Sequence, residues 1–256
     1  MKTFAPAQIA ALRQLREVWG GIDFCLIGAS AVGCHLELPR PTNDLDITLS
    51  VPLNAFPGGL EKLIGWRQHP TKEHEWHGPG DVQVDVVPAG DELLAQGAVT
   101  WPRSGHRMSL VGMRLAFAMA SPLAIAEGLS VPVPKLQALA LLKMVAYLDR
   151  PPERERDLDD LAYILENYMP VHDERVFGDE VPERLDLYRR PAFLLGLDLR
   201  PALNPVERDA VKRFVALCRG MGARPSWTGC LMHSRPAWAA FPASKPANVD
   251  AAARAV

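Results

Sequence analysis

The sequence predicts an α+β fold in which a small mixed sheet is followed by a helical C-terminal part. Short apolar runs of strand type, such as FCLI at 24–27 and VQVDVVP at 82–88, lie in the first half of the chain. From residue 134 onward the apolar residues recur with a helical period, as in KLQALALLKMVAYLDR at 135–150. The chain has 256 residues, 48% of them hydrophobic, which suffices for the core of one or two domains.

In the first half, apolar runs bounded by glycine, proline and polar residues define the expected elements. Strands are expected at 24–28, 44–51, 74–78 and 82–88, with a further strand pair within 107–120. Helices are expected at 1–21, closed by a Gly-Gly pair, and at 30–38. A weaker helix is expected at 55–66, because Pro57 and two glycines interrupt its period.

In the second half, amphipathic periods predict helices at 135–150, 157–168, 189–199 and 205–220. The last residues are rich in Ala and Pro and have no such period. We therefore expect a mixed α/β domain over 1–125, a helical domain over 126–225 and a weakly ordered tail over 226–256.

Composition excludes several classes of protein. The net charge of −2 gives no general attraction to nucleic acid. The four cysteines, at 25, 34, 218 and 230, form no C-x-x-C pair, which argues against a zinc ribbon and favours the reducing cytoplasm. No run of eighteen apolar residues predicts a membrane span, so no membrane partner is expected.

Three acidic residues stand in apolar strand sequences. Asp44 and Asp46 are one residue apart, so on a strand their carboxylates point to the same face and repel each other. Asp85 lies between Val84 and Val86, where an isolated charge is costly. Together the three acids predict a site for a hard cation, Mg²⁺ or Mn²⁺, which prefers carboxylate oxygens and substrate phosphates.

A strand-to-helix turn precedes these acids. The strand at 24–27 ends at Gly28, and the helix begins at about Ser30. The free N–H groups of a helix N-terminus suit phosphate oxygens, and the Ser30 hydroxyl could add a donor. Alone this turn is a weak signal, because many strand–helix turns carry Gly and Ser.

These motifs resemble those of the DNA polymerase β-type nucleotidyltransferases, and in particular the AbiEii-type proteins, which include toxins of bacterial abortive-infection and toxin–antitoxin pairs. The resemblance covers residues 22–168 and rests on Gly28-x-Ser30, thirteen intervening residues, Asp44-x-Asp46, the later Asp85, Arg40-x-Thr42-x-Asp44, and Lys143…Arg150…Arg156-Asp157-x-x-Asp160. It implies a polymerase β-like nucleotidyltransferase domain followed by the helical domain.

The resemblance also implies roles for residues. Metal binding falls to Asp44, Asp46 and Asp85, which with Lys143 form the catalytic set. Nucleotide binding falls to Gly28, Ala29, Ser30, Arg40, Thr42, Arg150, Asp157 and Asp160. The implied substrate is a nucleoside triphosphate, the acceptor a tRNA end or a protein, and the partner a cognate antitoxin. Ala29 departs from a common second glycine, and Arg156 stands where relatives often have Lys.

Other interpretations of the same residues stay open. Lys143, Tyr147 and Arg150 follow a helical spacing that would place them on one face, but a snorkelling helix cation is equally common. Asp157 and Asp160 also suit a helix start. Zinc binding by His74 and His77 is disfavoured, because the H-E-x-x-H pattern is absent.

Three other functions are compatible with these sequence features. The first is a non-catalytic nucleotidyltransferase fold that binds a partner. The second is a nucleotidyltransferase that modifies a small molecule. The third is a nucleic-acid-binding regulator that uses the C-terminal helices, although no dense basic helix supports it.

Overall fold

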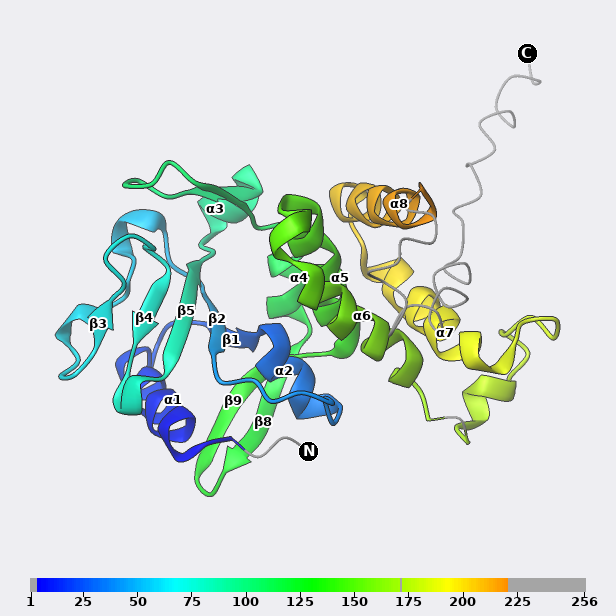
Figure 1. The fold of residues 1–256 in the computed structure, drawn as a ribbon, viewed down its shortest axis with the longest axis horizontal. Helices are drawn as coiled ribbons and strands as arrows, with labels where there is room; N and C mark the ends of the chain where they lie inside the picture. The colour runs from blue at the N-terminus through cyan, green and yellow to red at the C-terminus, as the bar shows by residue number, and fades with distance from the viewer. Residues whose placement is uncertain (1–3, 171, 221–256) are drawn as a thin grey trace, which may run out of the picture.

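The computed structural model describes residues 4–170 and 172–220, and its centre is a five-stranded sheet with the order β1-β2-β5-β4-β3 (Figure 1). The strands are β1 (Phe24–Ile27), β2 (Leu45–Leu49), β3 (Arg67–Gln68), β4 (Glu75–His77) and β5 (Gln83–Pro88). Neighbours β2 and β5 are parallel, and the other pairs are antiparallel. The predicted small mixed sheet is therefore confirmed.

The two faces of this sheet are buried by different parts of the chain. Ile47 and Val86 point into the main core, which includes Leu12 and Leu15 of helix α1 (Pro6–Val18). The opposite face enters a second core with Trp101, beside the short helices α3 (Asp91–Gln96) and α4 (Met113–Ala118). Residues one position apart on a strand face opposite sides, so this alternation also fixes where the acids point.

Two hairpins flank the sheet, and the apolar pattern of the sequence does not predict their full extent. The first joins β6 (Ala98–Thr100) to β7 (Arg107–Ser109), and the second joins β8 (Ala120–Ala126) to β9 (Leu129–Pro134). The strand pair expected within 107–120 was wrong in its second half, since this region holds β7 and then helix α4.

The helix expected at 55–66 was also wrong. In its place are two single 3₁₀ turns, Leu53–Ala55 and Leu60–Lys62. Between them Gly58 and Gly59 have φ values of 70° and 98°, which lie outside the right-handed helical region. The glycines thus end any helix before it can be extended.

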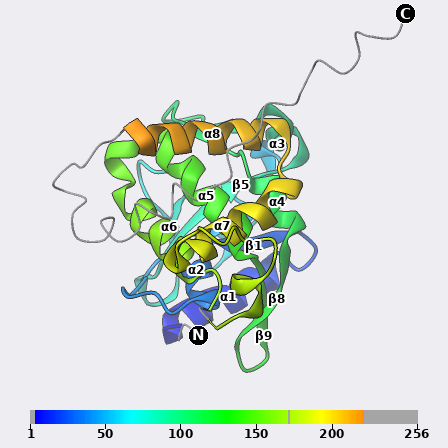
Figure 2. The same ribbon diagram turned by 90° about the vertical axis from the view of Figure 1, so that its right-hand side faces the viewer.

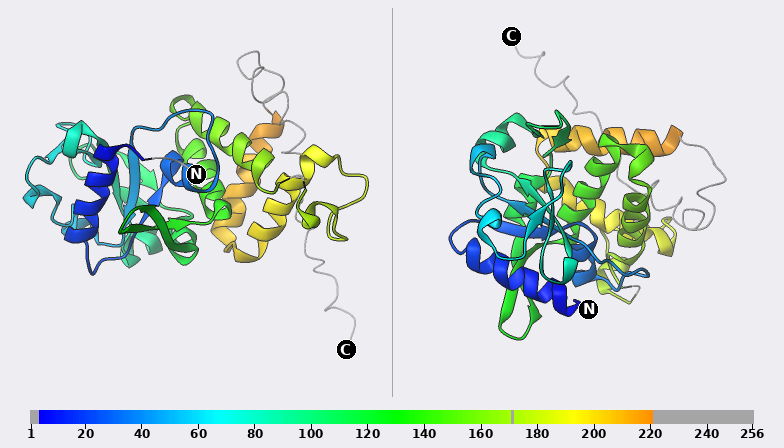
Figure 3. Two further views of the ribbon diagram at one scale, coloured as in Figure 1. Left: turned by 90° about the horizontal axis from the view of Figure 1, so that it is seen from below. Right: turned by 60° about the vertical axis from the view of Figure 1, so that its left-hand side comes forward.

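The predicted C-terminal helices are confirmed as α5 (Leu136–Asp149), α6 (Glu155–Asn167), α7 (Arg190–Leu199) and α8 (Pro205–Gly220). They gather on the side of the molecule away from β3, as Figures 1 and 3 show. Figure 2 shows α8 lying across α5, where the rings of Tyr147 and Phe214 meet edge to face at 6.0 Å. Helix α2 (Gly28–His35) lies between this group and the sheet.

Helix α1 begins at Pro6, inside the predicted range of 1–21. The tail predicted over 226–256 lies outside the described residues. Across the two described ranges, no helix is both long enough and apolar enough to cross a membrane.

Candidate active site

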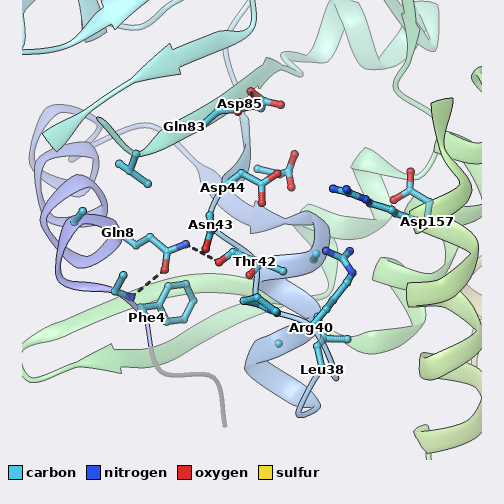
Figure 4. Close-up of a pocket in the computed structure, with 18 of the residues that line it drawn as sticks. Phe4, Gln8, Leu38, Arg40, Thr42, Asn43, Asp44, Gln83, Asp85 and Asp157 are labelled. Carbon is cyan, nitrogen blue, oxygen red and sulfur yellow. Dashed lines mark hydrogen bonds between the residues drawn. The ribbon is translucent and has the colours of Figure 1, made fainter. Parts of the chain in front are cut away.

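The acidic residues meet on neighbouring strands, at the face of the sheet turned away from Ile47. In the parallel pair β2–β5, Asp46 stands directly opposite Asp85. Adjacent strands lie about 4.7–4.9 Å apart, so the two carboxylates project side by side. Asp44 immediately precedes β2, and all three acids are half-buried and line one cleft (Figure 4). The fold therefore brings these three side chains together, as the sequence predicts.

This cleft has a volume of about 1210 Å³ and opens between the sheet and helix α6. Its far wall comes from α1 and the loop at 37–43, which carries Arg40 and Thr42. A second, smaller cavity of about 130 Å³ lies on the side of α4 and α5. Both cavities are lined by Asp46, Asp85, Lys143, Arg154 and Asp157.

The crowding of acids shifts their proton affinities. Loss of hydration, together with the nearby charges of Asp85 and Asp44, raises the pKa of Asp46 to about 8, although Lys143 acts in the opposite direction. Loss of hydration also raises the pKa of Asp85 to about 6, against a hydrogen bond of 3.1 Å from Gln83. Burial and the neighbouring acids thus outweigh the nearby charge of Lys143 at Asp46.

The donor set suits a hard divalent cation. Carboxylate oxygens on adjacent strands are the ligands that Mg²⁺ takes from proteins, and Mg²⁺ usually binds through one or two carboxylates plus phosphates and water. No three carboxylate, imidazole or thiolate side chains in the described part of the chain enclose a ready-made cage. Asp46 and Asp85, supported by Asp44, fit a cation that completes its shell with substrate oxygens.

Gly28 is required by the close approach of Asp46. It begins α2 with a φ of +66°, a left-handed value that favours glycine. A Cβ built at this position would lie 2.8 Å from the Cβ of Asp46 and still closer to its carboxylate. The glycine predicted as a phosphate-binding residue thus makes room for the side chain of Asp46.

The Ser30 hydroxyl has a different role from the predicted phosphate contact. Ser30 is fully buried, and its Oγ donates a hydrogen bond of 2.7 Å to the backbone oxygen of Asp44. It also lies 3.3 Å from the hydroxyl of Thr42. The first turn of α2 carries this side chain inward, so the hydroxyl positions the segment before β2. Ala29, in contrast, lines the large cleft.

A buried ion-pair network joins the loop at 37–43 to helices α5 and α6. Lys143 donates to Asp157 Oδ1 at 2.6 Å and approaches Asp160 Oδ2 at 2.8 Å. Arg40 Nη2 lies 2.8 Å from each oxygen of Asp160. Burial alone would lower the pKa of Lys143, but its two acidic partners outweigh burial and raise it.

This network assigns Asp160 a positioning role. The residue is 2% exposed and, unlike Asp157, does not line either cavity. The structure therefore does not bring Asp160, predicted to bind nucleotide, to the surface of the cleft, and its contacts are with Arg40 and Lys143. Arg40 itself lines the large cleft.

Replacing Asp160 by alanine is expected to reduce the free energy of unfolding by about 3 kcal/mol or more, because it leaves buried Lys143 without one partner. Urea unfolding of Asp160→Ala and of the exposed neighbour variant Asp159→Asn measures this difference. A loss for Asp160→Ala no larger than that of the control would contradict the assignment.

The predicted cationic face of helix α5 is only partly formed. Lys143 faces the acids, but Tyr147 is buried against α8. Arg150 lies beyond the end of α5, where it pairs with Glu153 at 3.0 Å and lines the small cavity. Helix α5 ends at Asp149, yet Arg150 lines the same small cavity as Lys143, so the i, i+7 spacing does bring these two cations to one side.

Two polar residues of the site were missed by the sequence analysis. Gln8 is buried, and its Nε2 donates to the backbone oxygen of Thr42 at 3.2 Å. Glu75 is buried opposite Asp85 and is held by Lys72 at 2.6 Å. Glu75 belongs to the strand predicted at 74–78, so its position next to Asp85 could have been predicted by pairing this strand with the one at 82–88. The contact of Gln8 with Thr42 joins residues 34 positions apart and could not be predicted from local pattern.

The chain is similar to the following three solved structures. The antibiotic-resistance factor ANT(2″)-Ia is 15% identical, with 82% of this chain and 94% of that chain covered and a TM-score of 0.42. The lincosamide antibiotic adenylyltransferase LnuA is 18% identical, with coverage of 64% and 99% and a TM-score of 0.38. A nucleotidyltransferase-like protein from Paracoccidioides brasiliensis is 16% identical, with coverage of 78% and 90% and a TM-score of 0.42.

No curated protein sequence matches the chain. Residues 11–233, which include all the acids of the site and the helices that face them, match the family model described as nucleotidyl transferase AbiEii toxin, type IV TA system. This match spans most of the chain, so the protein belongs to the AbiEii nucleotidyltransferase toxin family.

Proposed function

We propose that the protein is a metal-dependent nucleotidyltransferase that moves a nucleoside monophosphate from a nucleoside triphosphate to an acceptor hydroxyl. The observation that supports this best is the opposition of Asp46 and Asp85 on adjacent strands, in the same cleft as Lys143. A pair of carboxylates beside a buried cation suits a substrate that carries both a metal ion and phosphates.

In the proposed reaction, the acceptor oxygen attacks the α-phosphorus and forms a new P–O bond. The bond from this phosphorus to the oxygen that bridges to the β-phosphate breaks, and pyrophosphate leaves with the electron pair. Asp85 takes the proton from the acceptor hydroxyl, as a general base within reach of the cleft. Bound Mg²⁺ or Mn²⁺, held by Asp44, Asp46 and Asp85, supplies charge neutralisation.

The remaining cleft residues would hold the triphosphate. Backbone N–H groups at Gly28 and Ala29 begin helix α2 and suit phosphate oxygens. Lys143 has three N–H donors, of which Asp157 and Asp160 use two, so one is left for a phosphate.

Incubation with each of the four α-labelled nucleoside triphosphates, Mg²⁺ and total cellular RNA tests the proposal. Wild-type protein and Asp23→Asn, an exposed acid outside the cleft, are expected to transfer label, and Asp85→Asn is expected to lose transfer. Chelation by EDTA should stop the reaction. Absence of transfer together with absence of Mg²⁺–nucleotide binding in calorimetry would favour the non-catalytic partner-binding module.

The acceptor that we propose is an RNA end, such as that of a tRNA. The large cleft exceeds the roughly 300–1000 Å³ of ordinary small-ligand pockets, and Arg154 and Arg156 line it. Transfer to RNA should weaken steeply as salt rises, because phosphate contacts release counterions. Label in a protein, or in a small molecule such as the antibiotics of the ANT(2″)-Ia and LnuA structures, would contradict this choice.

We also propose a toxin role controlled by a cognate antitoxin, which follows from the family alone. Expression of the wild-type chain should arrest growth, and Asp44→Ala should relieve the arrest at equal protein levels. Growth arrest that persists with Asp44→Ala would contradict the proposal that toxicity depends on nucleotide transfer.

A further inference from the structure

Asp157 has a carboxylate oxygen that lacks a hydrogen bond. The residue lies in the first turn of α6 and is 7% exposed. Its Oδ1 accepts the 2.6 Å hydrogen bond from Lys143. Its Oδ2 is buried, and within the described residues no donor is within hydrogen-bond reach of it. Asp157 lines both cavities of the active site, so this buried oxygen belongs to a side chain that forms part of their wall.

What this oxygen lacks is a hydrogen-bond donor and not a positive charge. The charge of Asp157 is already balanced by Lys143, and Arg154 lies 3.7 Å from Oδ2, near enough for attraction but too far for a hydrogen bond. Buried polar atoms in native proteins nearly always have a partner, and exceptions call for an explanation such as a ligand. A neutral O–H or N–H group meets this need better than another cation.

The substrate offers such groups in only some of its parts. Phosphates at neutral pH carry negative charge and few donors, so a carboxylate oxygen repels them. A nucleoside carries sugar hydroxyls and base amino groups. The small cavity beside Asp157, about 130 Å³ and lined by apolar side chains such as Met113, Leu142 and Val145, holds a ring or a sugar but not a whole triphosphate.

We propose that Asp157 is a specificity-determining residue whose Oδ2 accepts a hydrogen bond from a hydroxyl or amino group of the nucleoside. This inference rests on the proposed function, because it assumes that a nucleoside triphosphate occupies the site. The residue thereby selects among nucleotides, while Lys143, bound to its other oxygen, is held beside the phosphates.

The test is calorimetric binding of Mg²⁺ complexes of ATP, GTP, CTP and UTP, and of their 2′-deoxy, 3′-deoxy and deaminated analogues, without acceptor. Wild-type protein is expected to bind the compound that carries the donor at least about tenfold more tightly than the analogue that lacks it, since hydrogen bonds to charged groups contribute that much. The sugar analogues and the base analogues together locate the donor.

In Asp157→Asn the amide oxygen can keep the contact with Lys143 while its NH₂ group replaces Oδ2, which turns an acceptor into a donor. The preference is then expected to fall below about threefold, whereas Asp159→Asn, an exposed neighbour on the same helix, should retain it. Thermal melting of each variant checks that it is folded.

If the wild-type protein binds each nucleotide and its analogues with the same affinity, the inference is overturned, whatever the variants show. Retention of the full preference by folded Asp157→Asn would also overturn it. In both cases nucleotide binding itself persists, so the proposed function stands. A wild-type protein that binds no Mg²⁺–nucleotide overturns both together.

Discussion

Replacing Asp46 by asparagine is expected to abolish nucleotide transfer and, in metal-free buffer, to raise the melting temperature of the protein. Asp46 stands opposite Asp85 and faces Lys143 across the site, and in the proposed function its carboxylate holds the metal beside the phosphates. Loss of such an electrostatic group reduces turnover by about 10²–10³-fold or more. The same substitution removes the repulsion between Asp46 and its acidic neighbours Asp85 and Asp44.

The stability gain follows from the pKa of Asp46. The folded value of about 8 lies above that of an unfolded aspartate, so at neutral pH the ionised carboxylate favours the unfolded chain. Asparagine carries no charge, and because one pKa unit corresponds to about 1.4 kcal/mol, we expect the free energy of unfolding to rise by up to about 5 kcal/mol and the melting temperature by several degrees. The gain should vanish below about pH 4, where the carboxyl is protonated in both states.

Thermal melts in EDTA at pH 7.5 and at pH 4 measure this effect, with Asp23→Asn as the matched control. With Mg²⁺ and nucleotide present, the order should reverse, because ligand binding stabilises only the protein that binds it. An Asp46→Asn protein that melts below wild type in EDTA at pH 7.5, or that transfers nucleotide at the normal rate, would contradict the assignment.

Sequence periodicity predicted the parts of the fold that local pattern controls. The alternation in β2 and β5 fixes which side chains share a face, but the opposition of Asp46 and Asp85 also needs the parallel register of the two strands, which this alternation does not specify. The β8–β9 hairpin escaped prediction because its strands contain Pro122, Pro132 and Pro134, which weaken the usual strand signal. Prolines are tolerated there because each of these strands pairs only with the other.

Contacts between residues far apart in the chain could not be predicted in the same way. Arg40 and Asp160 are 120 residues apart, and their ion pair exists because α6 packs against the loop before β2. Ser30 has the residue type and spacing of a phosphate ligand, but the turn of α2 directs its hydroxyl to the backbone of Asp44. Motifs thus identified which residues gather, and tertiary packing decided what each one contacts.

Replacing Gly28 by alanine is expected to reduce nucleotide transfer by about 10²-fold or more, because the new Cβ would collide with Asp46. The nearest atoms include the Cβ of Asp46, 2.8 Å away, which strand β2 fixes in place, so rotation of the side chain cannot relieve the contact. Either Asp46 or the start of α2 must move, and both belong to the proposed site.

Gly97→Ala is the matched control for this prediction. Gly97 has a similar φ of +71°, but in the described chain nothing lies within 4 Å of an added Cβ. The Gly97→Ala variant therefore has the backbone strain of an alanine in a left-handed conformation, about 1–2 kcal/mol, without the collision. Both variants should lose stability, and only Gly28→Ala should also lose turnover. Equal turnover in the two variants would show that Asp46 does not depend on the space that Gly28 leaves.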